Sequence, residues 1–356
     1  MKLKNIFLNL VSVGTILIVL SLSACKTTSE IQFQALEAPR VILPADINRI
    51  AFVDRNQHFP SDSVVHYYSV TGVAMKDTID HTQEMPFNCY QGFSENISEY
   101  LQQDSIPFVR LPRKMMPDTI RHFSPLEWFR VDSICKETQS DVLVVLEDIQ
   151  AFNKHDIVEG DTFWALTEVH YYGLWRIYDP LYQKLYDNRL LVDSLFLESQ
   201  DVSFDRLVNE KLPDREELLN DASYELGRSY VDLISPQWEN ISRDYFVSGE
   251  KRLSAALYYI NRNDFDKAIC LWESLTKEED MKLAGRAAYN LAVIYEMKGD
   301  VKKGIEWIRK AIYFYKMMKN MPSEYKKVEA YSLILNARWV NIKKIKQFFG
   351  EEENGN

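Results

Sequence analysis

Two segments in the last third of the chain repeat each other at a fixed offset. Residues 253–275 read LSAALYYINRNDFDKAICLWESL, and residues 289–312 read YNLAVIYEMKGDVKKGIEWIRKAI. Small residues recur at matching positions, so that Ala256 corresponds to Ala292 and Ala268 corresponds to Gly304. Small side chains let helices cross closely, and the ND and GD pairs favour a turn between them. The pattern therefore predicts two helical hairpins, each packed against the next.

This spacing resembles the tetratricopeptide repeat, whose period is about 34 residues. The resemblance implies an all-helical domain over residues 248–349, in which the first helix of each pair lines a concave groove. Arg286 and Asn290 lie four residues apart on one helix face, where they could hold a carboxylate or a peptide backbone. The alternative is a solvated face that binds no ligand. The candidate groove residues are Glu250, Leu253, Leu257, Arg286, Tyr289, Asn290, Val293 and Glu296.

The chain begins with two lysines, continues with an apolar stretch over residues 6–22, and reaches a cysteine at Cys25. These parts in this order predict a secretory signal peptide over residues 1–24. The alternative, an uncleaved membrane helix, is disfavoured because polar residues dilute the stretch and no positive cluster follows it. The LSAC sequence ending at Cys25 resembles the lipobox of bacterial lipoproteins. The resemblance implies that Cys25 is acylated and anchors the chain to a membrane.

Residues 25–40 contain few structural signals and are predicted to form a tether. Lys26 follows the cysteine. In enterobacterial lipoproteins an aspartate at this position favours the inner membrane, so its absence favours the outer membrane. Thr27 and Thr28 stand where surface-exported lipoproteins often carry acidic residues, which favours a protein that faces the periplasm.

Residues 41–212 predict a mixed α/β sheet domain. Apolar strand patterns occupy residues 47–55, 107–111 and 142–146, and helical patterns over residues 87–103 and 124–139 separate them. Two long strand patterns then flank Asp179-Pro180, which favours an antiparallel hairpin. This order predicts a mixed sheet with helices on one side. The hairpin sequence RIYDPLYQKLYDNRL is similar to a strand–turn–strand of the curli-secretion-channel lipoproteins, which implies that the domain could self-associate.

Residues 213–247 predict two helices that bridge the domains across Pro236. Asp214 and Glu217 have the spacing of a capping box, and Trp238, Ile241 and Tyr245 follow a helical spacing. Residues 350–356 predict a disordered tail. Taken together, these parts resemble an uncharacterised family of tetratricopeptide-containing lipoproteins from Bacteroidota-type bacteria. That resemblance is best over residues 226–311, and it implies a location and an architecture but no known activity.

The chain carries 52 acidic and 42 basic residues, a formal net charge of −10. Removing residues 1–24 deletes two lysines and no acid, which leaves −12. Nucleic-acid binding needs clustered positive charge, so it is not expected. The six histidines form no HExxH motif, and the chain has no CxxC, GxSxG or Walker motif. Neither catalysis nor a cofactor is therefore expected. His58, His66 and His81 share one region with Asp54, Asp62 and Asp77, where a metal site is the alternative to ordinary surface residues, which are favoured.

Two smaller patterns involve modification and redox state. Three cysteines remain beside Cys25, and buried thiols are favoured over a Cys89–Cys135 disulfide. Six Asp-Ser/Thr-aliphatic triplets are similar to O-glycosylation sites of Bacteroides-type bacteria, which makes Ser105 and Thr119 candidate acceptors. The alternative for these triplets is turn and cap chemistry.

These observations lead to three hypotheses of function. The first is a non-enzymatic envelope lipoprotein, anchored through Cys25, whose repeats bind an unknown protein or peptide. The second is a structural subunit of an oligomeric envelope or secretion-associated assembly, formed through the α/β domain. The third is a hydrolase or glycan-binding protein that uses the region between Tyr67 and His81.

Overall fold

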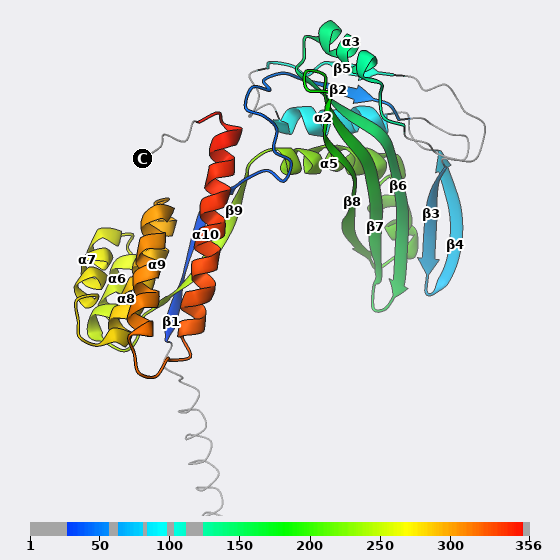
Figure 1. Ribbon diagram of the computed structural model, residues 1–356. Coiled ribbons are helices and arrows are strands. Elements are labelled where there is room, and N and C mark those ends of the chain that lie inside the picture. The colour runs from blue at the N-terminus through cyan, green and yellow to red at the C-terminus, as the bar shows by residue number, and fades with distance from the viewer. Residues whose placement is uncertain (1–26, 57–62, 81–83, 98–102, 112–123, 352–356) are drawn as a thin grey trace, which may run out of the picture. The chain divides into compact units, whose positions relative to one another are not determined.

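The computed structural model describes residues 27–56, 63–80, 84–97, 103–111 and 124–351. The chain divides into two compact units: a helical unit of residues 1–37 and 238–343, and a sheet unit of residues 38–237 and 344–356. A mixed sheet domain followed by an all-helical region confirms the predicted fold class (Figure 1). The chain leaves the helical unit after one strand and returns after completing the sheet unit, so the sheet unit is an insertion.

The sheet unit contains a seven-stranded mixed sheet. Strand β6 runs parallel to β2 in its first part and parallel to β3 in its second, and it pairs antiparallel with β7 along nearly its whole length. The predicted hairpin around Asp179 is confirmed as β7 and β8. The elements are β2 (Ile50–Asp54), β3 (Ser63–Val70), β4 (Val73–Asp80), α2 (Met85–Ile97), β5 (Phe108–Arg110), α3 (Trp128–Thr138), β6 (Val142–Glu159), β7 (Phe163–Asp179), β8 (Lys184–Asp201), α4 (Phe204–Arg206), the π-helical turn η2 (Leu207–Lys211) and α5 (Arg215–Ile234).

Helices cover both faces of this sheet, contrary to the prediction of one side. On β2, Ile50 and Phe52 point into a core shared with α2 and α5. The alternate residues Ala51 and Val53 pack against α3 on the opposite face. Side chains alternate between the two faces of a strand, so a strand that is apolar at every position must be covered twice.

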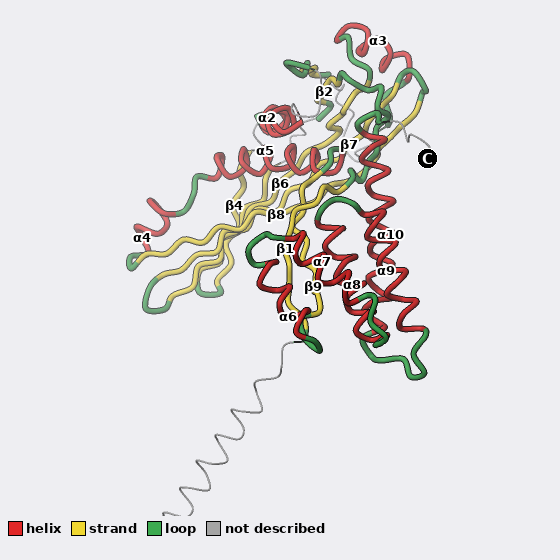
Figure 2. Tube along the Cα trace, turned by 90° about the vertical axis from the view of Figure 1, so that its left-hand side faces the viewer, coloured by secondary structure: helices red, strands yellow, loops and turns green. Residues whose placement is uncertain are grey.

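Helix α5 belongs to the sheet unit and is not a bridge. Asp214 accepts hydrogen bonds from the backbone N–H groups of Glu216 and Glu217, which confirms the predicted start of the helix. Its Leu219, Leu226 and Tyr230 side chains are buried in the core of the sheet unit. Figure 2 shows α5 running along one face of the sheet.

The helical unit combines two helical hairpins, a long last helix and a two-stranded ribbon. Its elements are β1 (Thr28–Glu37), β9 (Gln237–Phe246), α6 (Lys251–Ile260), α7 (Phe265–Leu275), α8 (Met281–Met297), α9 (Val301–Lys316) and α10 (Tyr325–Phe348). The small residues predicted at the crossings are buried, and a Cβ added at Gly304 would lie 3.2 Å from the carbonyl oxygen of Ala292. The predicted hairpins are therefore confirmed.

Strands β1 and β9 pair with each other and correct two predictions. Residues 28–37, which were predicted to be part of a tether, form a regular strand, and residues 237–246, which were predicted to be a helix, form its partner. Ile31 of β1 packs against the hydrophobic cores of both helical hairpins. The ribbon is thus part of the helical unit's core.

Candidate functional site

Residues of α8 that were predicted to line a groove bind the chain's own β9. The side-chain oxygen of Asn290 on α8 accepts the backbone N–H of Phe246 at 2.7 Å, and its amide nitrogen donates to the backbone carbonyl of the same residue at 2.7 Å. Asn290 is fully buried. One asparagine therefore satisfies both backbone groups of a residue in an extended strand, as expected for a groove that holds a peptide.

Arg286, one turn before Asn290, binds a carboxylate of the same chain. Its guanidinium donates to Glu324, with the shortest N–O distance 2.6 Å, and to the backbone carbonyl of Ser248 at 2.9 Å. The Tyr315 hydroxyl also donates to Glu324, at 2.8 Å. The hydrogen bond with Glu324 raises the pKa of Arg286. Arg286 therefore binds a carboxylate and a backbone carbonyl of its own chain.

Glu296 completes this row on α8. It accepts two hydrogen bonds from the guanidinium of Arg243 on β9, each at 2.9 Å, and one from the Tyr331 hydroxyl at 2.6 Å. A buried carboxylate is tolerated when it is paired and hydrogen-bonded in this way. Burial, followed by the charge of Glu296, raises the pKa of Tyr331 well above its usual value, so this hydroxyl remains a donor.

The other predicted groove residues have structural roles. Leu253 lies in the core between the first helical pair and α8, and Tyr289 and Val293 lie in the core shared with α9 and α10. Glu250 caps α6 by accepting the backbone N–H of Arg252. Leu257 is partly buried against the first of these cores. The groove is thus filled by β9 and by core side chains.

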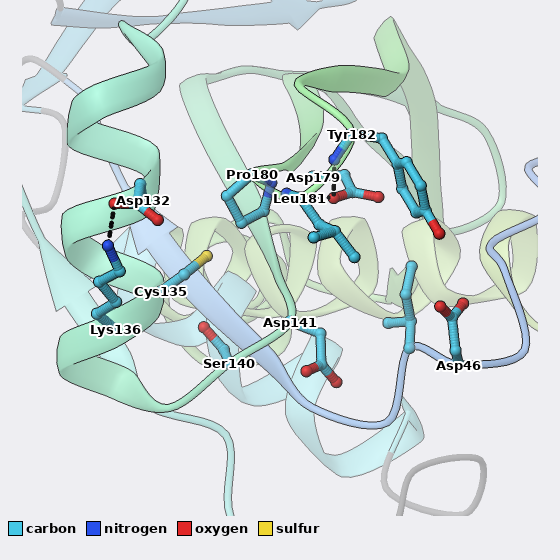
Figure 3. Close-up of a pocket in the computed structure, with 11 residues that line it drawn as sticks. Asp46, Asp132, Cys135, Lys136, Ser140, Asp141, Asp179, Pro180, Leu181 and Tyr182 are labelled. Carbon is cyan, nitrogen blue, oxygen red and sulfur yellow. Dashed lines mark hydrogen bonds and ion pairs between the residues drawn. The ribbon is translucent and has the colours of Figure 1, made fainter.

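A second candidate is a pocket of about 420 Å³ in the sheet unit, between α3 and the β7–β8 turn (Figure 3). Four aspartates line it. Asp179 accepts the backbone N–H groups of Leu181 and Tyr182, and Asp141 accepts those of Asn48 and Arg49. These two carboxylates therefore fix turns. The lining aspartates are Asp46, Asp132, Asp141 and Asp179.

The remaining polar groups of this pocket give little nucleophilic or basic character. Lys136 pairs with Asp132 at 2.5 Å on the same helix. Burial raises the pKa of the Cys135 thiol to about 11, so it is protonated at neutral pH. Of the lining residues, the sequence analysis named Asp179-Pro180 as a turn and Cys135 as a buried thiol, and none of them as part of a binding site.

A buried ionic cluster at the start of β6 was also missed by the sequence analysis. The Glu147 carboxylate is fully buried and lies 2.8 Å from Arg55 and 3.1 Å from Arg176. The Tyr178 hydroxyl donates to the same carboxylate at 3.1 Å. The sequence signal that could have indicated this cluster is a glutamate directly after an unbroken apolar run. The cluster ties β2, β6 and β7 together and has the composition of a structural site.

Several predicted sites lie outside the described residues: Cys25, Thr119, His58, Asp62 and His81. Ser105 is exposed, just before β5. Within the described part of the chain, no group of three potential metal-ligating side chains occurs. His66 and Asp77 face each other as backbone partners in the β3–β4 hairpin.

Cys89 and Cys135 are free, buried thiols on opposite faces of the sheet, as predicted, whereas the thiol of Cys270 is exposed, contrary to the prediction. A search of the described helices finds none with the length and hydropathy to span a membrane.

Comparison with known structures gives similarities at low identity. A putative neuraminyllactose-binding hemagglutinin homolog from Helicobacter pylori is 8% identical over 53% of this chain and 83% of that one, with a TM-score of 0.28. The PelC dodecamer from Paraburkholderia phytofirmans is 8% identical over 58% and 99%, with a TM-score of 0.20. A Xanthomonas campestris protein of the DUF330 family is 11% identical over 55% and 91%, with a TM-score of 0.25.

Comparison of the sequence with known protein families gives separate matches for the two parts of the chain. No curated protein matches it. The family described as domain of unknown function DUF6340 matches residues 254–337, within the helical unit. The family described as domain of unknown function DUF8603 matches residues 47–246, from the start of the sheet unit to the end of β9. Because this match covers more than half of the 356 residues, the chain belongs to the DUF8603 family.

Proposed function

We propose that this protein is a lipid-anchored scaffold of the bacterial cell envelope, whose helical unit binds a partner protein without catalysing a reaction. The signal sequence and Cys25 support the anchor. Lys26 supports the outer membrane, and Thr27 and Thr28 support a chain that faces the periplasm. The repeat spacing supports membership of the tetratricopeptide-containing lipoproteins of Bacteroidota-type bacteria. The helical hairpins, in which Asn290 of α8 already binds the backbone of an extended strand, support a binding role.

The anchor and the helical unit are close together in this proposal. Strand β1 begins at Thr28, three residues after Cys25. A residue spans at most about 3.6 Å, so the strand begins within about 11 Å of the acylated cysteine. The backbone carbonyl of Thr27 already accepts the N–H of Val247 at 3.0 Å, which leaves little free chain. The helical unit is therefore the part held next to the membrane.

The groove itself is a poor place for a partner. A peptide that entered it would have to replace β9, together with the paired Arg243 and Glu296 and both hydrogen bonds of Asn290. Breaking a buried ion pair and leaving buried backbone groups without hydrogen-bond partners has a free-energy cost of roughly several kcal/mol. We therefore place the partner on a surface that is open.

The observation that carries this proposal is the exposed apolar face of α10. Leu333 is 70% exposed, Ile334 44% and Val340 53%. The small residues Ala330 and Ala337 lie between them on the same face and are also exposed. Stacked helical repeats normally end in a helix with a polar outer face. An apolar stripe with small residues at helical spacing fits an amphipathic helix of a partner protein.

The test is site-specific photo-cross-linking in the native host. A photoreactive residue at position 333 or 340 should give the same adduct, identified by mass spectrometry. Arg309 is exposed on α9 and is the matched control position, which should give no such adduct. Replacing Cys25 with serine should abolish the acylation of the chain and reduce the adduct. Equal adducts at position 309, or none at positions 333 and 340, would contradict the binding proposal.

A second candidate function is a structural subunit that self-associates through the sheet unit. Strand β8 favours it, because this long strand pairs with β7 on one side only among the described strands. An unpaired strand edge is a template for pairing with another chain.

A further inference from the structure

Strand β8 differs from the usual edge of a sheet. It has 18 residues without a proline or a glycine, and β7 is its partner in the described part of the chain. Natural proteins protect such edges by keeping them short, bulged, proline-containing or strongly charged. The only irregularity in its pairing lies near one end, between the Ile177 and Tyr178 positions of β7. The segment from Asp187 onward therefore offers a regular edge.

The same strand carries exposed apolar side chains. Leu190 is 57% exposed, Val192 62% and Phe196 60%, and they share the face opposite α5. On the other face, Leu191 and Leu195 pack against the core of the sheet unit. An open edge and an apolar stripe on one strand indicate a sheet that continues into another molecule.

The sequence of β8 is self-complementary in one register. We propose that two copies of the chain pair antiparallel along β8, with Leu191 of one copy opposite Leu191 of the other. In this register Arg189 faces Asp193 of the other copy, twice because of the two-fold symmetry. Leu190 likewise faces Val192, and Asn188 faces Ser194. This inference deepens the second candidate function, on which it rests.

Neighbouring registers are unfavourable. Centring the pair on Leu190 would place Asp193 opposite Asp187, and centring it on Arg189 or Asp193 would place like charges directly opposite each other. Centring it on Val192 would leave Arg189 and Asp193 each opposite a leucine. Opposite charges across a strand pair stabilise it and like charges destabilise it. Among the registers centred on residues 189 to 193, the Leu191 register is the one in which the charged and apolar side chains both match.

The charged residues are available for this pairing. Asp193 is exposed, and the Arg189 side chain is 33% exposed. Arg189 already donates to Asp187 of its own strand at 2.7 Å through Nε. A guanidinium has five N–H donors, so it can bind both Asp187 and Asp193 of the other copy. Nine residues, from Asp187 to Leu195, would pair over about 30 Å.

The first test is charge reversal in the full chain, measured by sedimentation velocity in detergent. The wild type should be a dimer. Asp193→Arg should raise the dissociation constant about tenfold, because two attractive pairs become repulsive. Adding Arg189→Glu to this variant should restore the dimer, because both pairs reform with exchanged charges. Circular dichroism checks that each variant is folded.

The second test is disulfide formation in a chain whose exposed Cys270 is replaced by serine. Residues that face each other across antiparallel strands lie about 4.5–5.5 Å apart between Cα atoms, within the range that a disulfide spans. Leu191→Cys should therefore give a covalent dimer. Leu195→Cys is the matched control, on the same face, and its two copies would lie about 27 Å apart along the strands. It should remain monomeric on a denaturing gel.

The outcomes separate the register from self-association. A monomeric wild type would overturn both the register and the second candidate function. A dimer that keeps its dissociation constant in Asp193→Arg, or that is not restored by the double reversal, would overturn the register alone. Equal cross-linking at positions 191 and 195 would also overturn the register.

Discussion

At the scale of single residues, Asn290 makes contacts that no other side chain in the groove can replace. Replacing it with alanine leaves the N–H and the carbonyl of Phe246 buried without partners. Two unsatisfied backbone groups should lower the stability of this region by about 3 kcal/mol. Native-state hydrogen exchange at the Phe246 amide should then be about 100-fold faster. Asn336→Ala is the matched control, since Asn336 is exposed and donates within its own helix. Equal effects of the two variants would contradict a special role for Asn290.

His155 makes the sheet unit sensitive to acid. Its ring is buried, with Nδ1 2.6 Å from the Thr167 hydroxyl, and burial followed by the charge of Arg215 lowers its pKa to about 4. The unfolded chain, with a histidine pKa of about 6.5, binds more protons between these values, so stability falls as the pH decreases from 6.5 to 4. The loss should be about 2 kcal/mol at pH 5.

His155→Gln should remove this part of the pH dependence while keeping a polar group near Thr167. The measurement is the urea midpoint of the sheet unit at pH 7 and pH 5. We expect the difference between the two midpoints to be smaller in the variant than in the wild type. An unchanged difference would show that other groups control the acid sensitivity.

At the scale of secondary-structure elements, two glycines determine how closely α2 and α5 pack. A Cβ added at Gly92 would lie 1.9 Å from the Tyr224 carbonyl oxygen, and one at Gly227 would lie 1.9 Å from that of Cys89. Either alanine must push the helices apart and disturb the core beneath them. We expect Gly92→Ala and Gly227→Ala each to lower the free energy of unfolding of the sheet unit by about 3 kcal/mol.

Gly160→Ala is the matched control for these variants, because its Cβ would approach nothing closer than 3.7 Å. Chemical denaturation followed by circular dichroism distinguishes them. A Gly227→Ala variant as stable as Gly160→Ala would mean that the two helices can separate at little cost.

The elements that the sequence predicted well are those whose signal is local. The buried run of β6, the Asp179 turn and the Asp214 cap each depend on neighbouring residues, and each lies where it was predicted. The ribbon was missed because β1 and β9 are separated by the whole sheet unit. The Trp238 and Ile241 spacing resembles a helix, and pairing with β1 overrides that preference. The alternation of Ile31, Phe33 and Ala35 was a strand signal that could have been used.

The prediction of the candidate site was limited in the same way, because it lacked contacts between residues that are distant in the sequence. The repeat placed Arg286 and Asn290 on one helix face and Glu296 farther along the same helix, and all three bind other parts of the chain. The repeat carried no information about the strand that occupies this face. Glu324 and Arg243, the internal partners of Arg286 and Glu296, come from distant positions. Helical hairpins can therefore be predicted from periodicity, whereas the partners of their polar side chains depend on tertiary contacts.

At the scale of the whole molecule, the sheet unit is inserted between two strands of one ribbon. The N–H of Val247 donates to the carbonyl of Thr27, and the side chain of Gln34 donates to that of Asn240. Residues later in β1 therefore contact residues earlier in β9, so the two strands are antiparallel. The two ends of the inserted segment, which follow β1 and precede β9, therefore lie close together. Insertions whose ends lie close together are tolerated by the host domain. The helical unit should therefore fold without the sheet unit.

This expectation can be tested by replacing residues 38–236 with a two-residue Asn-Gly turn, which suits a tight hairpin. The shortened chain should be helical, unfold cooperatively and protect the Phe246 amide as the full chain does. Deleting residues 26–37 from it removes Ile31, which packs against both helical cores, and should abolish the cooperative transition. If the shortened chain loses protection at Phe246 while its helices remain, the ribbon depends on the sheet unit. The two units would then fold as one cooperative unit, because β9 would pack against α8 only when both of them are folded.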